Sequence, residues 1–140
     1  MNGRTARFLA TSAAVLLVGI SGLIAADSND PWVAPARAAR KKNPIAADEN
    51  SLAAGKAAYI KECRSCHGDS GTGDGPAAKD LTKPPGNFTT AKFWEQSDGA
   101  IFWKVTEGRK PMPTFDTLLT EEQRWHVVNY LHIYAPKDKK

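Results

Sequence analysis

The amino-acid sequence predicts an all-α fold, in which one small helical domain follows an N-terminal leader or anchor and a linker. Three segments, 51–62, 98–107 and 121–134, combine helix-capping residues with apolar residues at helical spacing. No βαβ pattern accompanies them, and 140 residues suit one small domain with appendages. We therefore expect an export segment, a linker, the helical domain and a basic tail, at residues 1–26, 27–47, 48–136 and 137–140.

The first 26 residues have the pattern of an export segment. Arg4 and Arg7 lie in a short basic start, and residues 8–26 are uncharged and mostly apolar. The densest apolar part, residues 13–20, has the length of a signal-peptide core, whereas the whole uncharged run is just long enough to span a bilayer. No small-x-small cleavage pattern lies at its end. A cleaved signal peptide and a retained inner-membrane anchor therefore both remain open, and either would export the rest of the chain while the two arginines stay inside.

Residues 27–47 are predicted to form a solvated, partly extended linker, because prolines interrupt them at positions 31, 35 and 44. The cluster Arg37–Lys42 offers a second interpretation, a basic patch that contacts anionic lipid head groups or an acidic partner. The N-terminal 47 residues also account for the net charge of +4, since residues 48–140 hold 13 basic and 13 acidic residues. Nucleic acid is therefore not expected as a partner.

One motif, Cys63-Arg64-Ser65-Cys66-His67, carries the chemistry of the domain. Two cysteines separated by two residues and followed by a histidine form the pattern that attaches c-type haem. The two thiols can add across the two vinyl groups of a protoporphyrin and form thioethers, and the histidine is then held where a ring nitrogen can bind the iron. The motif therefore predicts one covalently attached haem c, with Cys63 and Cys66 as attachment points and His67 as an iron ligand.

Two other chemistries could use the same cysteines. A dithiol redox pair needs a βαβ context, which the sequence lacks. A structural zinc site needs two further ligands at a suitable spacing. The other histidines, His126 and His132, are six residues apart in a predicted amphipathic helix, which is a poor spacing for closing such a site. Haem attachment is the leading interpretation.

The first predicted helix, residues 51–62, delivers the cysteines to the site. Asn50 or Ser51 can cap it, and the two acidic residues directly before Asn50 lie favourably near its positive end. Gly55 lies in its middle, where glycine costs about 1 kcal/mol relative to alanine. This position therefore indicates a close approach by another helix.

The segment after the motif, Gly68–Gly75, contains four glycines but lacks the strand and the lysine of a phosphate-binding loop. We expect it to pack as a turn against the porphyrin. An iron-bound histidine needs an acceptor for its second ring nitrogen. We assign this role for His67 to the carbonyl of Pro76, with Pro84 or Pro85 as alternatives.

Two further helices complete the predicted domain. The second helix has a Ser97 cap and Gly108 directly after its last residue. Its Trp103 is either a neighbour of the haem or a half-exposed ring. A capping box that starts at Thr120 opens the last helix.

Met112 lies between two prolines, in a segment that cannot form a regular helix. Methionine often fills gaps in a core, but its thioether is also a soft ligand that suits haem iron and raises the potential relative to a second histidine. The flanking prolines would hold the loop against the iron, on the face opposite His67. We therefore expect Met112 as the second axial ligand, with His126, His132 or an open position as alternatives.

Residues 48–136 resemble a class I monohaem cytochrome c of the bacterial respiratory type. The matching features, in chain order, are a helix with Gly55 and Tyr59, Cys63-Arg64-Ser65-Cys66-His67, Gly75-Pro76, Lys110-Pro111-Met112-Pro113 and a last helix with Tyr130. The resemblance implies helices wrapped around one haem, with no substantial sheet. It also implies that the first and last helices cross, with Gly55 and Tyr59 against Val127 and Tyr130. Carried over by position, it implies haem attachment by Cys63 and Cys66 and iron ligation by His67 and Met112.

The resemblance and an iron ligated on both faces imply single-electron transfer between redox protein partners in the cell envelope. Such an iron has no open position for a substrate, so an electron carrier is expected rather than an enzyme. Apolar walls around the haem are expected from Tyr59, Phe102, Trp103 and Tyr130. Two alternatives keep the haem: a subunit of a respiratory or dehydrogenase complex, tethered through residues 8–26, and an enzyme or gas sensor with an open iron site. The expected location is the periplasm, with or without the tether.

Overall fold

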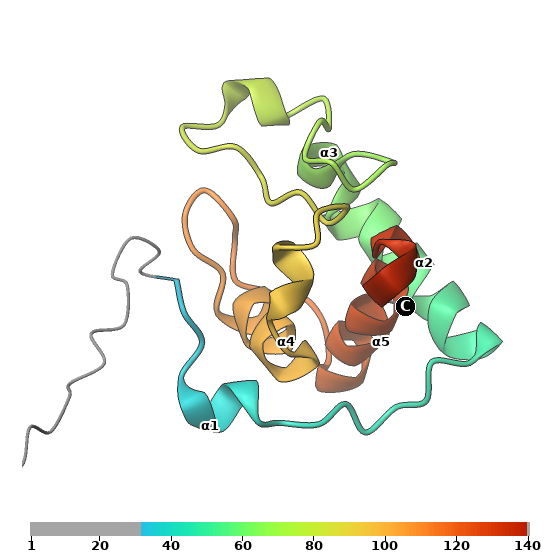
Figure 1. The fold of residues 1–140 in the computed structure, drawn as a ribbon. Coiled ribbons are helices and arrows are strands. Elements are labelled where there is room, and N and C mark those ends of the chain that lie inside the picture. Colours follow the sequence, from blue (N-terminus) through green and yellow to red (C-terminus); the bar gives the residue numbers. More distant parts are fainter. Residues whose placement is uncertain (1–31, 140) are drawn as a thin grey trace, which may run out of the picture.

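The computed structural model describes residues 32–139. Its helices are α1 (Ala36–Ala39), α2 (Glu49–Glu62), α3 (Arg64–His67), α4 (Asp98–Glu107) and α5 (Glu121–Leu131), joined by the 3-10 turns η1 (Ala78–Asp80), η2 (Phe93–Glu95), η3 (His132–Tyr134) and η4 (Lys137–Lys139) (Figure 1). Within these residues no strand forms, and one isolated bridge joins Arg109 to Met112. The predicted all-α fold is confirmed. The predicted export segment lies outside the described residues, and none of the helices described is long and apolar enough to cross a membrane.

Helix α2 begins two residues earlier than predicted, because Asp48 is its N-cap instead of Asn50 or Ser51. The backbone of Asp48 is extended, and its carboxylate accepts a hydrogen bond from the Ser51 N–H at 2.8 Å. A carboxylate at this position satisfies a free amide and also complements the positive end of the helix. Asn50 and Ser51 therefore lie inside the first turn.

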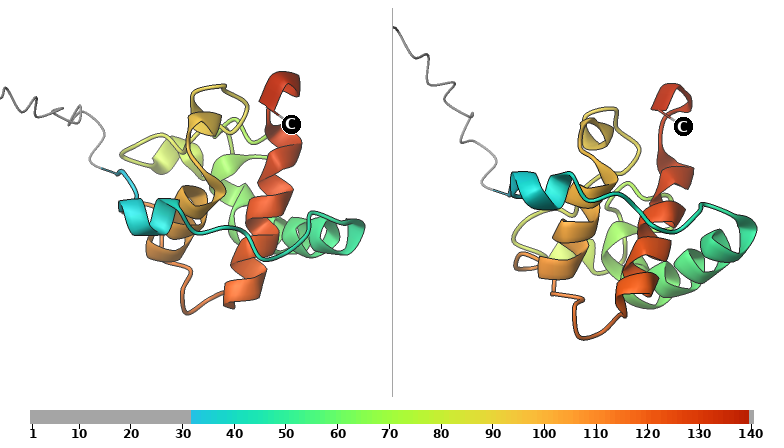
Figure 2. Two further views of the ribbon diagram at one scale, coloured as in Figure 1. Left: turned by 60° about the horizontal axis from the view of Figure 1, so that its bottom comes forward. Right: turned by 90° about the horizontal axis from the view of Figure 1, so that it is seen from below.

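Helices α2 and α5 cross at Gly55 (Figure 2). A Cβ at this position would overlap the backbone carbonyl of His126, so only glycine allows the two backbones to come this close. One turn later the Tyr59 ring packs against the Tyr130 ring, with 5.3 Å between their centroids. The helix crossing that the resemblance implies is confirmed.

Helix α4 has the predicted bounds. Its Ser97 cap accepts a hydrogen bond from the Ala100 N–H at 3.2 Å, and Gly108 follows its last residue with φ of 63°. Helix α5 begins at the predicted capping box, in which Thr120 and Gln123 exchange hydrogen bonds. It ends as an α-helix at Leu131, and the remaining residues of the predicted helix form the 3-10 turn η3.

The buried core lies between α2, α4 and α5 and continues under the loop that follows α3. Phe102 stacks on Trp125 at its centre, with 3.9 Å between the ring centroids and 15° between the planes. The buried members are Tyr59, Phe88, Ile101, Phe102, Val105, Phe115, Leu119, Trp125, Val127, Val128, Tyr130 and Leu131.

Residues 32–47, the described part of the predicted linker, are mostly exposed as expected, but they also contact the helical domain, and we call them the N-terminal strap. They run along α4 and α5 before entering α2 (Figures 1 and 2). Lys41 forms an ion pair with Glu121 at 2.6 Å, and the Asn43 side chain donates to the Asn129 Oδ1 at 2.8 Å. These partners lie 80 and 86 positions away in the sequence, so neither contact leaves a local signal in the composition of the strap.

Candidate haem site

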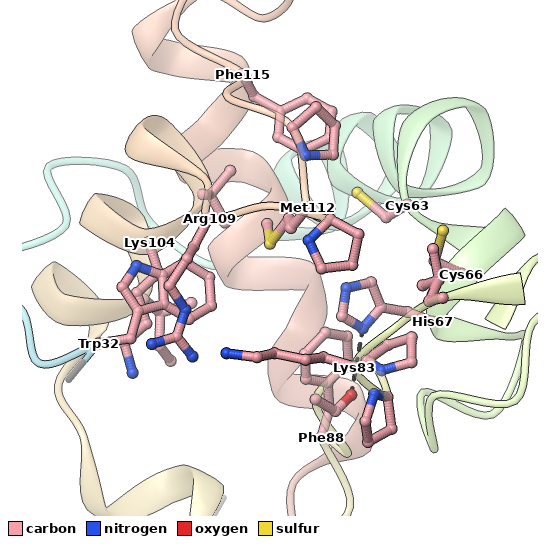
Figure 3. A pocket seen from close by; sticks show the side chains of 18 of the residues that line it. Trp32, Cys63, Cys66, His67, Lys83, Phe88, Lys104, Arg109, Met112 and Phe115 are labelled. Carbon is pink, nitrogen blue, oxygen red and sulfur yellow. Dashed lines mark hydrogen bonds between the residues drawn. The ribbon is translucent and has the colours of Figure 1, made fainter. Parts of the chain in front are cut away.

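An apolar cleft opens between α3, α4 and the loop that carries Met112 (Figure 3). Its apolar lining consists of Leu81, Pro84, Pro85, Phe88, Phe93, Ile101, Val105, Pro111, Met112, Pro113, Phe115 and Leu131. Its polar and charged lining consists of Trp32, Glu62, His67, Lys83, Gln96, Lys104, Arg109 and Lys110. Cys63, Cys66 and Gly86 complete it. A cleft of this kind suits a large, flat, mostly apolar ligand with a few polar groups.

The bend between α2 and α3 brings the two cysteines and the histidine of the motif to this cleft. Cys63 ends α2 by donating its N–H to the Tyr59 carbonyl at 2.9 Å, and its own carbonyl then accepts the His67 N–H at 2.9 Å. All three side chains therefore line the cleft from one side, and neither cysteine forms a disulfide.

Burial raises the pKa of the Cys63 thiol to about 12. A dithiol redox pair needs the opposite, a thiol whose pKa is lowered so that the thiolate can react. In the part of the chain that the structure describes, no group of three or more His, Cys, Asp or Glu side chains could hold a metal ion. The site therefore supports neither the dithiol nor the zinc interpretation.

The His67 imidazole is oriented by Gly86 and Phe88, in the loop that follows the turn η1. Its Nδ1 lies 3.2 Å from the Gly86 carbonyl oxygen, and its ring stacks on the Phe88 ring with 4.5 Å between centroids and 18° between planes. With Nδ1 protonated as the donor, Nε2 is the nitrogen that can bind a metal. Burial lowers the pKa of His67, against the opposing effect of the Gly86 carbonyl, and this favours the neutral ligand form.

The structure corrects the predicted acceptor for this histidine, because Gly86 takes the role assigned to Pro76. The glycine-rich loop folds back onto the outside of α3, where the Ala77 N–H donates to the Ser65 carbonyl at 2.9 Å. Pro76 is consequently exposed and does not line the cleft. The two alternatives, Pro84 and Pro85, do line the cleft but also do not accept from His67.

Met112 is presented by a tight loop on the side of the cleft that faces His67 (Figure 3). Arg109 and Met112 exchange backbone hydrogen bonds of 3.0 and 2.9 Å, which close the loop. At its start Gly108 has φ of 63°, and a Cβ there would overlap the Pro113 carbonyl. The loop thus requires glycine, and it holds the methionine in the cleft, partly buried.

The other histidines are engaged away from the cleft. The Nδ1 of His126 lies 2.8 Å from the Ser51 hydroxyl, and the Nε2 of His132 lies 2.9 Å from an Asp98 carboxylate oxygen. Neither residue lines the cleft, so the geometry does not favour either as an iron ligand.

The prediction of the residues that form the apolar walls is wrong. None of the four candidates lines the cleft: Tyr59, Phe102, Trp103 and Tyr130. The phase of α4 explains part of this result. Ile101 and Val105, one turn apart, face the cleft, whereas the neighbouring Phe102 faces Trp125 and the core. Trp103 is half-buried outside the cleft. Phe88, which lines the cleft, was not predicted from the sequence, although its position two residues after Gly86 in a proline- and glycine-rich run could have indicated it.

The donor set of the cleft fits one haem c. Two thiols could hold its vinyl edge, one imidazole nitrogen and one thioether could bind iron from facing walls, and aliphatic and aromatic side chains surround the space between them.

Residues 50–131, more than half of the chain, match the family model described as cytochrome C oxidase, cbb3-type, subunit III. The chain belongs to this family of c-type cytochromes.

Individual proteins agree with this assignment. The chain is 32% identical over 93 residues to the cytochrome c6 of Rippkaea orientalis (strain PCC 8801 / RF-1), a match that covers 63% of this chain and 75% of that protein. It also resembles a chain of the Kuenenia stuttgartiensis reducing HAO-like protein complex Kustc0457/Kustc0458, with a TM-score of 0.60 and 32% identity over 66% of this chain. This chain spans only 47% of that one.

A second solved structure, the KustC0563 c-type cytochrome, is similar with a TM-score of 0.52 and 25% identity, covering 59% of this chain and 98% of that chain. Together these matches show a class I monohaem cytochrome c with a covalently bound haem c and its iron. They also show haem-based electron transfer as its function.

Proposed function

We propose that this cytochrome is a one-electron carrier with a closed iron site, in which Cys63 and Cys66 attach the haem and His67 and Met112 ligate the iron. The observation that carries the proposal is the entry of His67 and Met112 into one apolar cleft from facing walls, with both cysteines beside the histidine. When bound, the haem supplies a reversible couple between ferric and ferrous iron. No coordination position is then left for a substrate.

The surrounding residues keep the two ligands in place during electron transfer. The Gly86 carbonyl and the Phe88 ring fix the plane of the His67 imidazole, and the hydrogen-bonded loop after Gly108 fixes Met112. Because the same ligands suit both oxidation states, little has to move when an electron arrives. The apolar walls exclude water and, together with a thioether ligand, favour a high potential.

The place of action that we propose is the periplasm, with electrons passing between respiratory partners. The basic and apolar pattern of residues 1–26 supports export, and covalent haem attachment to this motif takes place outside the cytoplasm in bacteria.

A second candidate is a cytochrome subunit of a larger redox complex, tethered through residues 8–26. The likeness to a chain of an HAO-like protein complex favours it. Purification in mild detergent separates the two candidates: a protein that elutes alone and is released from membranes by salt supports the free carrier, whereas co-elution with other redox proteins supports the subunit.

Mass spectrometry of the exported protein tests haem attachment and shows where the mature chain begins. We expect the mass of one haem above that of the polypeptide in the wild type, and incomplete or no attachment in Cys63→Ala and Cys66→Ala variants. A full-length polypeptide without added mass, from cells that attach haem to other cytochromes, would contradict the proposal.

A further inference from the structure

Trp32, the first described residue, lies at the cleft although the family match begins only at residue 50. Its ring has the Arg109 guanidinium 4.6 Å and the Lys104 ammonium 5.4 Å from its centroid. Both cations also line the cleft. Figure 3 shows these three side chains together at the end of the cleft away from Cys63 and Cys66, with the Lys83 side chain extending toward them.

Basic side chains gather at this end of the cleft. Among the described residues that line the cleft, four carry a cationic side chain and one, Glu62, an anionic side chain, and Glu62 directly precedes Cys63 at the opposite end. Cationic side chains attract an anionic group, and this attraction is stronger beside an apolar space than in open water. Arginine and an indole N–H are both suited to binding a carboxylate.

The chemistry of the cofactor supplies such a group. In a protoporphyrin the two vinyl groups lie on one edge and the two propionates on the opposite edge. Cysteines that hold the vinyl edge therefore direct the carboxylate edge toward the other end of the cleft, where Trp32, Lys104 and Arg109 lie.

We propose that the N-terminal strap completes the haem site by holding Trp32 beside Arg109 and Lys104, and that these three side chains receive the haem carboxylates. The inference deepens the proposed function and rests on it. It makes the strap, which lies outside the matched region, a part of the cofactor site instead of a spacer.

The strap is fixed to the same helix that carries Lys104, so the position of Trp32 is defined. Helix α1 packs on α4 at Gly99, where a Cβ would overlap the Ala38 carbonyl. The Ser97 hydroxyl donates to the Ala39 carbonyl at 2.5 Å, and the Lys41 ammonium lies 4.7 Å from the centroid of the Phe102 ring.

Contacts between these side chains and the haem carboxylates should affect the redox potential. Ionised carboxylates near the iron stabilise the more positive ferric state. Cations and a hydrogen-bond donor beside them weaken that effect and favour the ferrous state. Removal of Trp32 or of the Arg109 charge should therefore lower the midpoint potential. We expect the ratio of ferrous to ferric protein at a fixed potential to fall about three- to tenfold, which corresponds to roughly 30–60 mV for one electron.

The test uses the full-length haem-loaded protein and four variants: Trp32→Ala, Trp32→Phe, Arg109→Gln and, as the control, Val33→Ala. Val33 is 71% exposed and does not line the cleft. Trp32→Phe keeps an aromatic ring against the two cations and removes only the N–H donor, so it also serves if the alanine variant folds poorly. Redox titration gives the potential, and resonance Raman spectroscopy of the propionate bending modes reports directly on the hydrogen bonds of the carboxylates.

We expect lower potentials and shifted propionate modes in the three Trp32 and Arg109 variants, with wild-type values for Val33→Ala. Wild-type potentials and propionate modes in all three, with a normal haem couple, would overturn the inference and leave the proposed function intact. A wild-type protein without covalently attached haem would overturn both.

Discussion

Replacement of Gly55 by alanine tests the helix crossing on which the position of the haem motif depends. In an exposed helix this substitution stabilises by about 1 kcal/mol, because alanine has the higher helix propensity. Here the added Cβ would overlap the His126 carbonyl and lie 2.7 Å from the Tyr130 Cβ. The carbonyl is part of the α5 backbone and cannot rotate away, so α2 and α5 must separate.

The steric cost of the added Cβ at position 55 should exceed its gain in helix propensity. Overpacking of a core costs about 1–3 kcal/mol and occasionally more, and a clash with backbone belongs at the upper end. After the gain in helix propensity is subtracted, Gly55→Ala should lower the free energy of unfolding by about 2 kcal/mol, or the melting temperature by roughly 10 °C. Ala57→Gly, on the exposed face of the same helix, is the matched control and should cost about 1 kcal/mol from propensity alone.

Guanidinium unfolding of the haem-loaded proteins, followed by far-ultraviolet circular dichroism, gives both values. If Gly55→Ala raised the free energy of unfolding by the 1 kcal/mol or so that propensity predicts, the close approach of α2 and α5 would be refuted. An unchanged free energy of unfolding together with an unchanged haem spectrum would also refute this close approach.

Substitutions at Gly108, Phe88 and Tyr59 test the site and the residues that support it. Gly108→Ala should displace the loop that carries Met112 and weaken the sulfur-to-iron charge-transfer band of the ferric protein. Gly86→Ala, where a Cβ would meet only the Phe88 ring at an ordinary contact distance of 3.9 Å, should leave that band unchanged. Phe88→Ala should lower the free energy of unfolding by about 3–5 kcal/mol in a denaturant titration, because it removes a buried ring. Burial raises the pKa of Tyr59 from 10.0 to about 12, so the unfolded chain loses this proton first as the pH rises. The free energy of unfolding should consequently fall between pH 10 and 12, by about 2–3 kcal/mol, and titrations of Tyr59→Phe should lack this part of the fall.

Sequence reasoning succeeded where an element is defined by its own residues. The serine cap and the terminal glycine gave both bounds of α4, and the capping box gave the start of α5. Capping interactions span only three or four residues, which explains why they can be inferred without a structure. The predicted start of α2 was two residues too late because three of the four residues at 48–51 can act as N-caps. In the structure the N-cap is Asp48.

The features that escaped prediction depend on contacts between distant segments. The acceptor for His67 is Gly86, nineteen positions away, and its place beneath the ring follows from the path of the loop after α3. The strap looked like a linker because its composition is basic and interrupted by prolines. Its contacts, such as that between Asn43 and Asn129, involve residues that show no pattern of their own in the sequence. Which residues of α4 line the cleft depends on how the helix is rotated about its axis. Ile101 and Phe102 are adjacent and both apolar, so the sequence does not show which of the two faces the cleft.

The optical spectrum of the ferric protein, with and without Met112, tests the closed iron site most directly. For the wild type we predict low-spin iron with a weak sulfur-to-iron charge-transfer band at the red end of the visible spectrum, and no binding of carbon monoxide to the ferrous form. Met112→Ala should lose the band and bind carbon monoxide readily, whereas His132→Ala, which changes a histidine outside the cleft, should resemble the wild type. High-spin iron in the wild type, with carbon monoxide binding equal to that of Met112→Ala, would contradict ligation by both His67 and Met112.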